Sequence, residues 1–525
     1  MNSRLSIGIP RWPFKRRQGD TRPKNCYTER LTPDILHQIF VESLPKSPYP
    51  SLHEAPLNVS QVCQSWRKMV LGSPLLWSEI HVGSFISPNV SFPGHARHLE
   101  EWIKRSGDCP LSLGILFKGS ENPDPAMVTD VDAVIGKILP HVQRWRRIHL
   151  FIPAACRTPF LQALSTGAPY LDELLMNFDM TSMWHPLQAD VSLCPQLSKL
   201  TLPPDVRFLC DNPVILHRVQ VLHLSFTSMD DCFHCLDSCP SIEEINFVLF
   251  SNYVDFSTCI GQSVRHLPNL QHMKVHGGVK GSNRHYTNHP RNNIGLFFDC
   301  LRVPSLTSLE IIQPWANQVP HWNHLSSLFV RSQPRSSLSN SHSSVEELTM
   351  SGSQMDERQF VDTLGYLPHL KHLLVDGCLV TAFTMGALIA PLDTPSSTDS
   401  PGSTGIKAES HHWLCPRLSR IGIRRDASEE SYKAMARLVA QRWPLKSPSR
   451  QVGKEREERE SLPGPARITS IVIDQKDKYE VVLHMGIKEC VEEGLEVLDH
   501  NLEPIHNAKR LATIFNAQRR QRGTN

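Results

Sequence analysis

The residues best suited to chemistry lie close together near the middle of the chain: Cys232, His234, Cys235 and Cys239. Thiolates and imidazole at short spacing can bind zinc. However, the cysteines are three and seven residues apart within a segment expected to be helical (228–239), so the thiols share one apolar face, and no second CxxC or HxxxH motif completes a tetrahedral set. We therefore expect buried structural thiols and no metal.

Other motifs for catalysis are equally weak. The segment "HGGVKGSN" (276–283) is rich in glycine but lacks the spacing of a phosphate-binding loop, so we interpret it as a loop between repeats. The 26 histidines are spread along the chain, and no HExxH or GxSxG motif is present. The sequence predicts a protein that is not an enzyme and needs no cofactor.

Composition narrows the class of protein and of partner. The chain has 55 lysine and arginine residues against 52 acidic residues, a formal charge of +3, which does not indicate a nucleic-acid partner. It has no apolar run of membrane-spanning length and no secretory signal, and its 14 cysteines are mostly scattered singly. We expect a soluble protein of the cytoplasm, the nucleus or both, with no membrane partner.

A pattern with apolar residues at positions i, i+3 and i+5 recurs along the chain. The eleven copies are WRRIHL (145–150), LDELLM (171–176), LSKLTL (197–202), VQVLHL (219–224), IEEINF (242–247), LQHMKV (270–275), LTSLEI (306–311), VEELTM (345–350), LKHLLV (370–375), LSRIGI (418–423) and ITSIVI (468–473). Positions i+3 and i+5 point to the same side of a β-strand, and residue i packs at the bend before it. Each copy therefore predicts one short strand.

Helical segments lie between these copies, including 228–239, 355–367 and 428–443. Repeated alternation of strand and helix predicts an α/β fold with a parallel sheet and with helices outside it. Three biased segments, 331–344, 392–410 and 447–464, are interpreted as linkers inserted into the array.

A short helix is predicted near the N-terminus, in "LTPDILHQIFVESLP" (31–45). Thr32 is a suitable N-cap, and Pro33 occupies the first helical position, where its missing N–H costs nothing. Apolar residues at helical spacing make one face apolar, and so short a helix must pack on something. Residues 59–70 predict a second helix, and "PLLW" (74–77) a third short turn.

The repeated copies resemble degenerate leucine-rich repeats over residues 140–475. That family expects Asn or Cys three residues after the last leucine, and in the copies from 145 through 418 only LKHLLVDGC supplies one, at Cys378. A non-repetitive α/β domain with coincidental spacing is the alternative interpretation. The resemblance implies an irregular βα solenoid with polar residues on its inner curve.

"LTPDILHQIF", "VSQVCQSWRKMV" and "SPLLW" together resemble the F-box of fungal proteins, over residues 31 to about 82. The resemblance implies a Skp-family adaptor as the partner and, through it, a cullin-RING ubiquitin ligase. The residues that would form the small helical core or contact the adaptor are Leu31, Pro33, Ile35, Leu36, Ile39, Phe40, Val59, Val62, Cys63, Trp66, Leu75 and Trp77. The sequence does not separate these two roles.

On this basis we divide the chain into a disordered basic tail (1–29), an F-box-like helical domain (30–82), a connecting helix and strand region (83–139), the solenoid (140–475) and a C-terminal helical cap or tail (476–525). The predicted function is that of substrate receptor in a Skp/cullin/F-box ubiquitin ligase. The alternative is a non-catalytic repeat scaffold that uses the helical unit as a cap or outside a ligase. The candidate substrate-binding residues are His223, Ser225, Asn246, Lys274, His276, Glu310, Thr349, Ser351, Asp376 and Arg424.

Overall fold

The structure is a computed structural model of the chain. It describes residues 31–83, 92–117, 125–177, 187–210, 214–249, 254–277, 293–313, 322–333, 343–352, 355–389, 391–392, 412–425, 427–443, 465–473, 487–499 and 501–502. The predicted tail (1–29) and the predicted linker at 447–464 lie outside these residues. Within them, no helix is long and apolar enough to cross a membrane.

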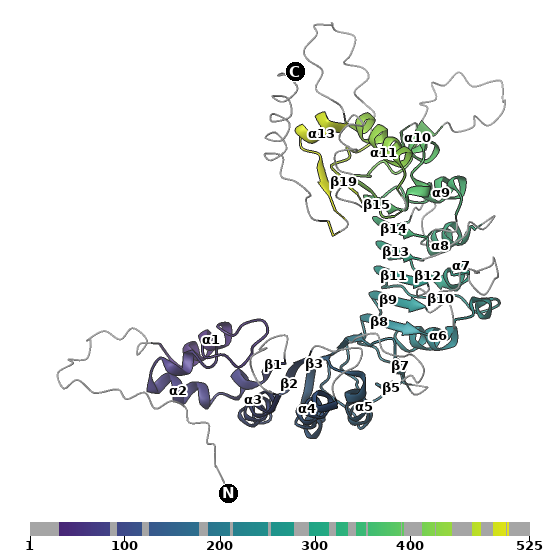
Figure 1. The fold of residues 1–525 in the computed structure, drawn as a ribbon. Coiled ribbons are helices and arrows are strands. Elements are labelled where there is room, and N and C mark those ends of the chain that lie inside the picture. Colours follow the sequence, from purple (N-terminus) through teal and green to yellow (C-terminus); the bar gives the residue numbers. More distant parts are fainter. Residues whose placement is uncertain are drawn as a thin grey trace, which may run out of the picture.

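One large parallel sheet runs through the molecule, and its strands follow one another in chain order. Its fourteen strands are β1 (Glu79–Val82), β2 (Leu111–Leu116), β3 (Trp145–Phe151), β4 (Glu173–Asn177), β6 (Lys199–Thr201), β8 (Val221–Phe226), β9 (Glu244–Leu249), β11 (His272–Gly277), β13 (Ser308–Ile312), β14 (Glu347–Ser351), β15 (His372–Val375), β18 (Arg420–Ile423), β19 (Ser470–Val472) and β20 (Glu496–Leu498). Figure 1 shows the strands lining the inner side of a curved array.

All eleven strands predicted from the repeated pattern are confirmed, because each copy coincides with a strand of this sheet. The apolar residues of the copies are buried; in β11, for example, Leu270, Met273 and Val275 are at most 2% exposed. The predicted α/β class with a parallel sheet is therefore confirmed, and the fold has the form of a solenoid.

Helices connect the strands and cover the outer side of the array (Figure 1). They are α3 (Phe92–Arg105), α4 (Pro125–Gly136), α5 (Arg157–Ser165), α6 (Met229–Ser238), α7 (Gly295–Asp299), α8 (His324–Ser332), α9 (Glu357–Leu364), α10 (Ala382–Ile389), α11 (Glu429–Arg442) and α13 (Lys488–Glu492). The predicted N-cap of α11 is confirmed, since the Ser428 side chain accepts a hydrogen bond from the backbone of Ser431. Three two-stranded sheets supplement the main sheet: β5 (Leu187–Asp190) with β7 (Val206–Leu209), β10 (Arg265–His266) with β12 (Leu301–Arg302), and β16 (Pro391–Leu392) with β17 (His412–Trp413).

The sheet extends beyond the predicted range 140–475 at both ends. Strands β1 and β2 precede it, and β20 follows it, so the connecting region and part of the C-terminal segment belong to the solenoid. The predicted linker at 331–344 also starts too early, because α8 continues to Ser332 and the Arg331 guanidinium donates to the carbonyls of Phe298 and Leu301. Similarly, the first residue of the linker at 392–410 belongs to β16.

The N-terminal helical unit, residues 31–78, lies at one end of the array (Figure 1). It contains α1 (Pro33–Glu42), a 3₁₀ helix (Val59–Gln61), α2 (Gln64–Leu71) and a 3₁₀ turn (Pro74–Trp77). The predicted second helix over 59–70 is wrong in one respect, because it is interrupted at Cys63. Cys63 has extended backbone angles, and its Sγ accepts a hydrogen bond from the Trp66 N–H, so a new helix begins there.

Substitution of two glycines, Gly352 and Gly386, tests the backbone conformation after β14 against that of a helix interior. Gly352 follows β14 with a φ of +72°, and an added Cβ would lie 1.5 Å from the Gln313 carbonyl oxygen. Gly386 lies inside α10, where an added Cβ meets nothing within 4 Å. We expect Gly352→Ala to destabilise the protein by about 2 kcal/mol or more, because it combines backbone strain with a clash. Gly386→Ala should stabilise it by about 0.5–1 kcal/mol.

Urea denaturation followed by circular dichroism measures both changes. Equal effects of the two substitutions would contradict the described backbone at Gly352.

Candidate functional site

Helix α1 is apolar on two faces. Leu36 and Phe40 are 6% and 2% exposed and form its inner face. Leu31, Ile35 and Ile39, spaced four residues apart, are 36%, 50% and 45% exposed. The side of α1 opposite the core carries the exposed polar residues Asp34, Gln38 and Glu42. The unusual feature of the unit is that Ile35 and Ile39, beside the buried residues, remain half exposed.

Four more exposed apolar side chains lie on other segments of the unit: Leu52, Val62, Leu71 and Leu75. Val62 is 62% exposed just before α2, and Leu75 is 48% exposed in the turn Pro74–Trp77. Helix α1 contacts both α2 and this turn, and His37 on α1 shares a 2.6 Å hydrogen bond with the Ser73 hydroxyl at the start of the turn. We refer to Leu31, Ile35, Ile39, Val62 and Leu75 together as the exposed apolar face.

The remaining apolar residues form a small core. The Phe40 ring lies 4.9 Å from the Trp66 ring, and the buried Trp77 indole donates a 2.8 Å hydrogen bond to the Val70 carbonyl. Val59 is partly buried and also packs against this core.

The structure therefore divides the twelve candidate residues of this unit into two groups. Leu36, Phe40, Val59, Trp66 and Trp77 belong to the core; Pro33 and Cys63 are exposed alongside the exposed apolar face. The periodicity of the sequence did not distinguish the core residues from the exposed ones.

The unit is also joined firmly to the solenoid. Trp77 packs edge-on against Trp102 of α3 at 4.7 Å, and the Arg105 guanidinium lies 4.4 Å from the centre of the Trp77 ring. The first strand of the sheet is covered at its outer edge, since the His81 N–H donates a 2.6 Å hydrogen bond to the Pro48 carbonyl. An uncovered edge would leave unpaired backbone groups, so the unit acts as a cap as well.

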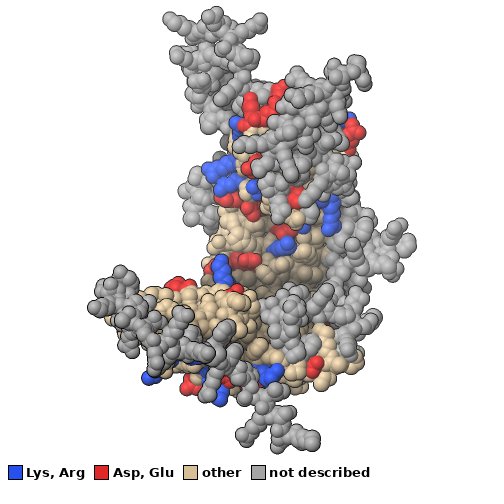
Figure 2. Space-filling view, turned by 60° about the vertical axis from the view of Figure 1, so that its left-hand side comes forward, with Lys and Arg blue, Asp and Glu red and all other residues tan. Residues whose placement is uncertain are grey.

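The inner face of the sheet carries most of the predicted substrate-binding residues. His223, Asn246, Lys274, Glu310 and Thr349 occupy position i+4 of five successive copies, and register places them side by side across β8, β9, β11, β13 and β14. Figure 2 shows this inner face, where lysine and arginine side chains lie beside aspartate and glutamate side chains. Its charges are mixed in sign rather than segregated.

A second row of inner-face residues escaped the sequence analysis. These residues occupy position i+2, two residues before the first row on the same side of each strand, and are in register with one another. They are Arg147, Glu173, Lys199, Val221, Glu244, His272, Ser308, Glu347, His372, Arg420 and Ser470. The alternation of side chains in a strand places positions i+2 and i+4 on the same side, so the pattern that identified the strands also predicts this second row.

Residues of the inner face pair with one another, both between the two rows and within the second row. His223 lies 3.1 Å from Glu244, and His372 lies 2.9 Å from Glu347. Such partly exposed pairs contribute little to stability, but they fix the side chains of the inner face in place.

Two of the predicted substrate-binding residues are not accessible. Ser351 and Asp376 are 1% and 3% exposed, and the Asp376 carboxylate accepts a hydrogen bond from the backbone N–H of Gly352. Ser351 ends β14 and Asp376 follows β15. Arg424 reaches across these two strands to bind Glu310 on β13. Ser225 and His276 lie in the same inner-face region and are partly buried.

Lys274, Glu310 and Arg424 form a cluster of charges on this face. The Lys274 ammonium lies 2.7 Å from one oxygen of the Glu310 carboxylate, and the Arg424 guanidinium lies 2.6 Å from the other. Burial, with the positive charges of Lys274 and Arg424, lowers the pKa of His276 to about 4. Although Glu310 is partly desolvated, its hydrogen bonds to Lys274 and Arg424 hold the pKa of its carboxyl below the usual value.

The cysteine cluster considered for zinc is part of the core. Cys232, Cys235 and Cys239 are fully buried on and after α6, and burial raises the pKa of the Cys232 and Cys235 thiols well above the ordinary value. The His234 ring shares a 2.8 Å hydrogen bond with the Cys210 carbonyl. Among the described residues, no three His, Cys, Asp or Glu side chains are placed to hold a metal ion.

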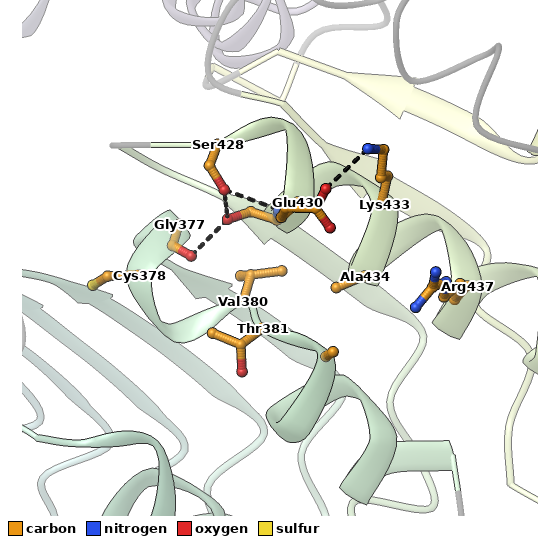
Figure 3. A pocket seen from close by; sticks show the side chains of 11 residues that line it. Gly377, Cys378, Val380, Thr381, Ser428, Glu430, Lys433, Ala434 and Arg437 are labelled. Carbon is orange, nitrogen blue, oxygen red and sulfur yellow. Dashed lines mark hydrogen bonds and ion pairs between the residues drawn. The ribbon is translucent and has the colours of Figure 1, made fainter.

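A cavity of about 220 Å³ lies between the start of α10 and the first turns of α11. Figure 3 shows Ser428, Glu430 and Lys433 at its edge. Ser428 shares a 2.9 Å hydrogen bond with Ser431, which donates to the Gly377 carbonyl, and Glu430 pairs with Lys433. The Ser428 and Ser431 hydroxyls are thus engaged in hydrogen bonds that join α11 to the residues after β15.

Comparison with known proteins adds little. No protein-family model matches the chain, and no curated protein sequence matches it. Among solved structures, a leucine-rich-repeat protein of Leptospira interrogans is similar at 11% identity over 65% of this chain and 97% of that chain, with a TM-score of 0.16. The assignment of a repeat fold therefore depends on the strands and their register.

The division of α1 into two faces predicts unequal effects of neighbouring substitutions. Phe40→Ala should lower the free energy of unfolding by about 3–5 kcal/mol, because it removes a buried aromatic ring. Ile39→Ala should change it by less than about 1 kcal/mol, since that side chain is half exposed. Chemical denaturation followed by circular dichroism measures the free energy of unfolding of both variants. A similar loss for both would show that Ile39 is buried as Phe40 is.

The low pKa of His276 predicts a dependence of stability on pH. Between about pH 6.5 and pH 4 the unfolded chain binds a proton at this histidine that the folded protein does not, so acidification across this range should destabilise the fold. His276→Gln should lose less stability than the wild type between pH 7 and pH 5. The two proteins are compared by urea denaturation at each pH, and identical pH slopes would show that His276 is protonated equally in both states.

Proposed function

We propose that the protein is a non-catalytic substrate receptor that docks a Skp-family adaptor through residues 31–78 and binds a target protein on the inner face of the solenoid. On this proposal the chain performs no bond-making step, and ubiquitin transfer belongs to the other subunits of a cullin-RING ligase. The observation that carries the proposal is the exposed apolar face, which lies within the segment that resembles an F-box.

The exposed apolar face suits a helical protein partner. Ile35 and Ile39 present about half of their surface to solvent although the same helix already has a buried face. Covering such residues in an interface gains free energy in proportion to the apolar area removed from water. The partner proposed to cover them is the adaptor, because the sequence motifs that resemble the F-box surround these residues.

The inner face supports the second half of the proposal. It is polar, of mixed charge, and displayed along many successive strands. Solenoids create extended concave surfaces of this kind, which suit an elongated segment of another protein.

The alternative function, a repeat scaffold capped by the helical unit, has one specific observation in its favour. The Pro48 carbonyl pairs with the edge strand β1, and Trp77 packs on Trp102, so the unit would protect the sheet edge even without a partner. Capping does not require Ile35 and Ile39 to be apolar, which is why we favour the receptor.

Adaptor binding provides the test. We expect the full chain to bind a recombinant Skp-family adaptor, and the double variant Ile35→Ser/Ile39→Ser to weaken binding by about 2–3 kcal/mol, roughly a hundredfold in Kd. The matched control is Ile215→Ser/Ile260→Ser, which removes two exposed isoleucines (49% and 67% exposed) from the solenoid and should leave the affinity unchanged. Phe40 and Trp66 are unsuitable for this test because both belong to the core.

Isothermal titration calorimetry measures the affinities, and thermal unfolding checks that both variants remain folded. No adaptor binding by the wild type would refute the ligase proposal. Adaptor binding without recruitment of a cullin would favour the scaffold.

A further inference from the structure

The inner face carries a cluster whose charges do not balance. Lys274 and Arg424 are both bound to the Glu310 carboxylate, at 2.7 Å and 2.6 Å, and each cation contacts a different oxygen. Two positive groups thus share one negative group, which leaves one unbalanced positive charge in this trio.

The cluster is accessible from the inner face. The side chains of Lys274, Arg424 and Glu310 are 37%, 29% and 23% exposed. Because Lys274 and Arg424 touch the same carboxylate, their nitrogens lie close enough together to contact one further small anionic group. Ion pairs at this level of exposure stay exchangeable, since solvent competes for each charge.

The position of Arg424 is unusual and points to a role beyond stability. Arg424 follows β18, yet its side chain reaches Glu310 on β13, past two intervening strands. A long side chain loses considerable rotational freedom when it is held in this extended arrangement. Its guanidinium also keeps donors that Glu310 does not use, because the ion pair occupies Nη1.

A neighbouring histidine adds no further charge at neutral pH. His276 lies on β11 two residues beyond Lys274, and burial together with the charges of Lys274 and Arg424 lowers its pKa to about 4. The imidazole is therefore neutral at pH 7 and adds no charge to the trio.

We propose that Lys274 and Arg424 bind an acidic side chain, a glutamate or an aspartate, of an extended segment of the target protein lying along the inner face. In the free protein Glu310 holds the two cations close together, and its carboxylate competes with the incoming carboxylate for them. The inference rests on the proposed role of the inner face as the receptor surface.

Two features favour a carboxylate over a phosphate group. Glu310 itself shows that a carboxylate fits between the two cations, and the unbalanced charge of the trio matches the single negative charge of one carboxylate. A phosphate group near −2 would exceed that charge and would face the Glu310 carboxylate.

The test compares three immobilised pools of peptides that are degenerate at every position except a fixed central residue, which is Glu, Gln or phosphoserine. We expect the full-length protein to bind the Glu pool about tenfold more than the Gln pool, because a charged hydrogen-bonding partner is replaced by a neutral one of the same shape. Binding to the Glu pool should weaken as salt is added.

Substitutions with opposite expected signs separate recognition from a structural role. Lys274→Met/Arg424→Met should reduce binding of the Glu pool to the level of the Gln pool. Glu310→Gln should increase binding of the Glu pool, because it removes the competing internal carboxylate. Lys104→Met is the control, since Lys104 lies exposed on α3, on the outer side of the array, and it should bind as the wild type does.

Three outcomes would overturn the inference: equal binding of the Glu and Gln pools, preference for the phosphoserine pool, or weaker Glu-pool binding by folded Glu310→Gln protein. Circular dichroism confirms folding of each variant. If the double variant fails to fold, the effect of Glu310→Gln on Glu-pool binding still tests the inference. Adaptor affinity is measured in parallel. Intact adaptor binding without Glu-pool preference overturns this inference alone, whereas Glu-pool preference without adaptor binding overturns the ligase proposal and leaves an acidic-segment receptor.

Discussion

The structure depends on one constraint: each repeat contributes one strand to the main sheet, and this strand pairs in parallel and in register with the strands of the neighbouring repeats. Register fixes which side of every strand faces the helices and which faces inward, since a slip of one residue would exchange the two sides. In β11 the shared register buries Met273 and Val275 and exposes His272 and Lys274 on the inner face. The same alternation in neighbouring strands turns isolated polar residues into continuous rows.

The ends of such a sheet need protection, and the N-terminal unit provides it at β1. The unit is small, so its own core is modest, and much of its apolar surface is shared with the solenoid through Trp77 and Trp102. What capping leaves unexplained is the second apolar face of α1. Leu36 and Phe40 anchor the helix in the core, whereas the Ile35 and Ile39 side chains are about half exposed to solvent.

Sequence reasoning found the strands because three apolar residues in each copy obey strand geometry, and burial of positions i, i+3 and i+5 leaves little freedom. It did not find the limits of the sheet. The strand expected in the connecting region 83–139 is β2 and belongs to the main sheet, and β20 was not predicted because it lacks the full pattern. Sequence reasoning also could not divide α1, since Ile35 and Leu36 are both apolar and only the position of α2 and Trp66 determines which one is covered. Likewise, Ser351 and Asp376 were predicted to be accessible, but both are buried. The contact between Arg424 and Glu310 joins residues 114 positions apart and depends on the curvature of the sheet, so the sequence did not predict it.

On the proposed function, the exposed apolar face beside the core of α1 docks the adaptor, whereas Leu36 and Phe40 stay in the core. Hydrogen–deuterium exchange of the full chain, with and without the Skp-family adaptor, tests it most directly, because backbone protection reports both folding and contact without any substitution. We expect peptides covering 31–44 and 59–77 to gain protection when the adaptor is added, while the solenoid strands exchange as before. Unchanged exchange in these two segments, at adaptor concentrations that saturate a known F-box protein, would contradict it.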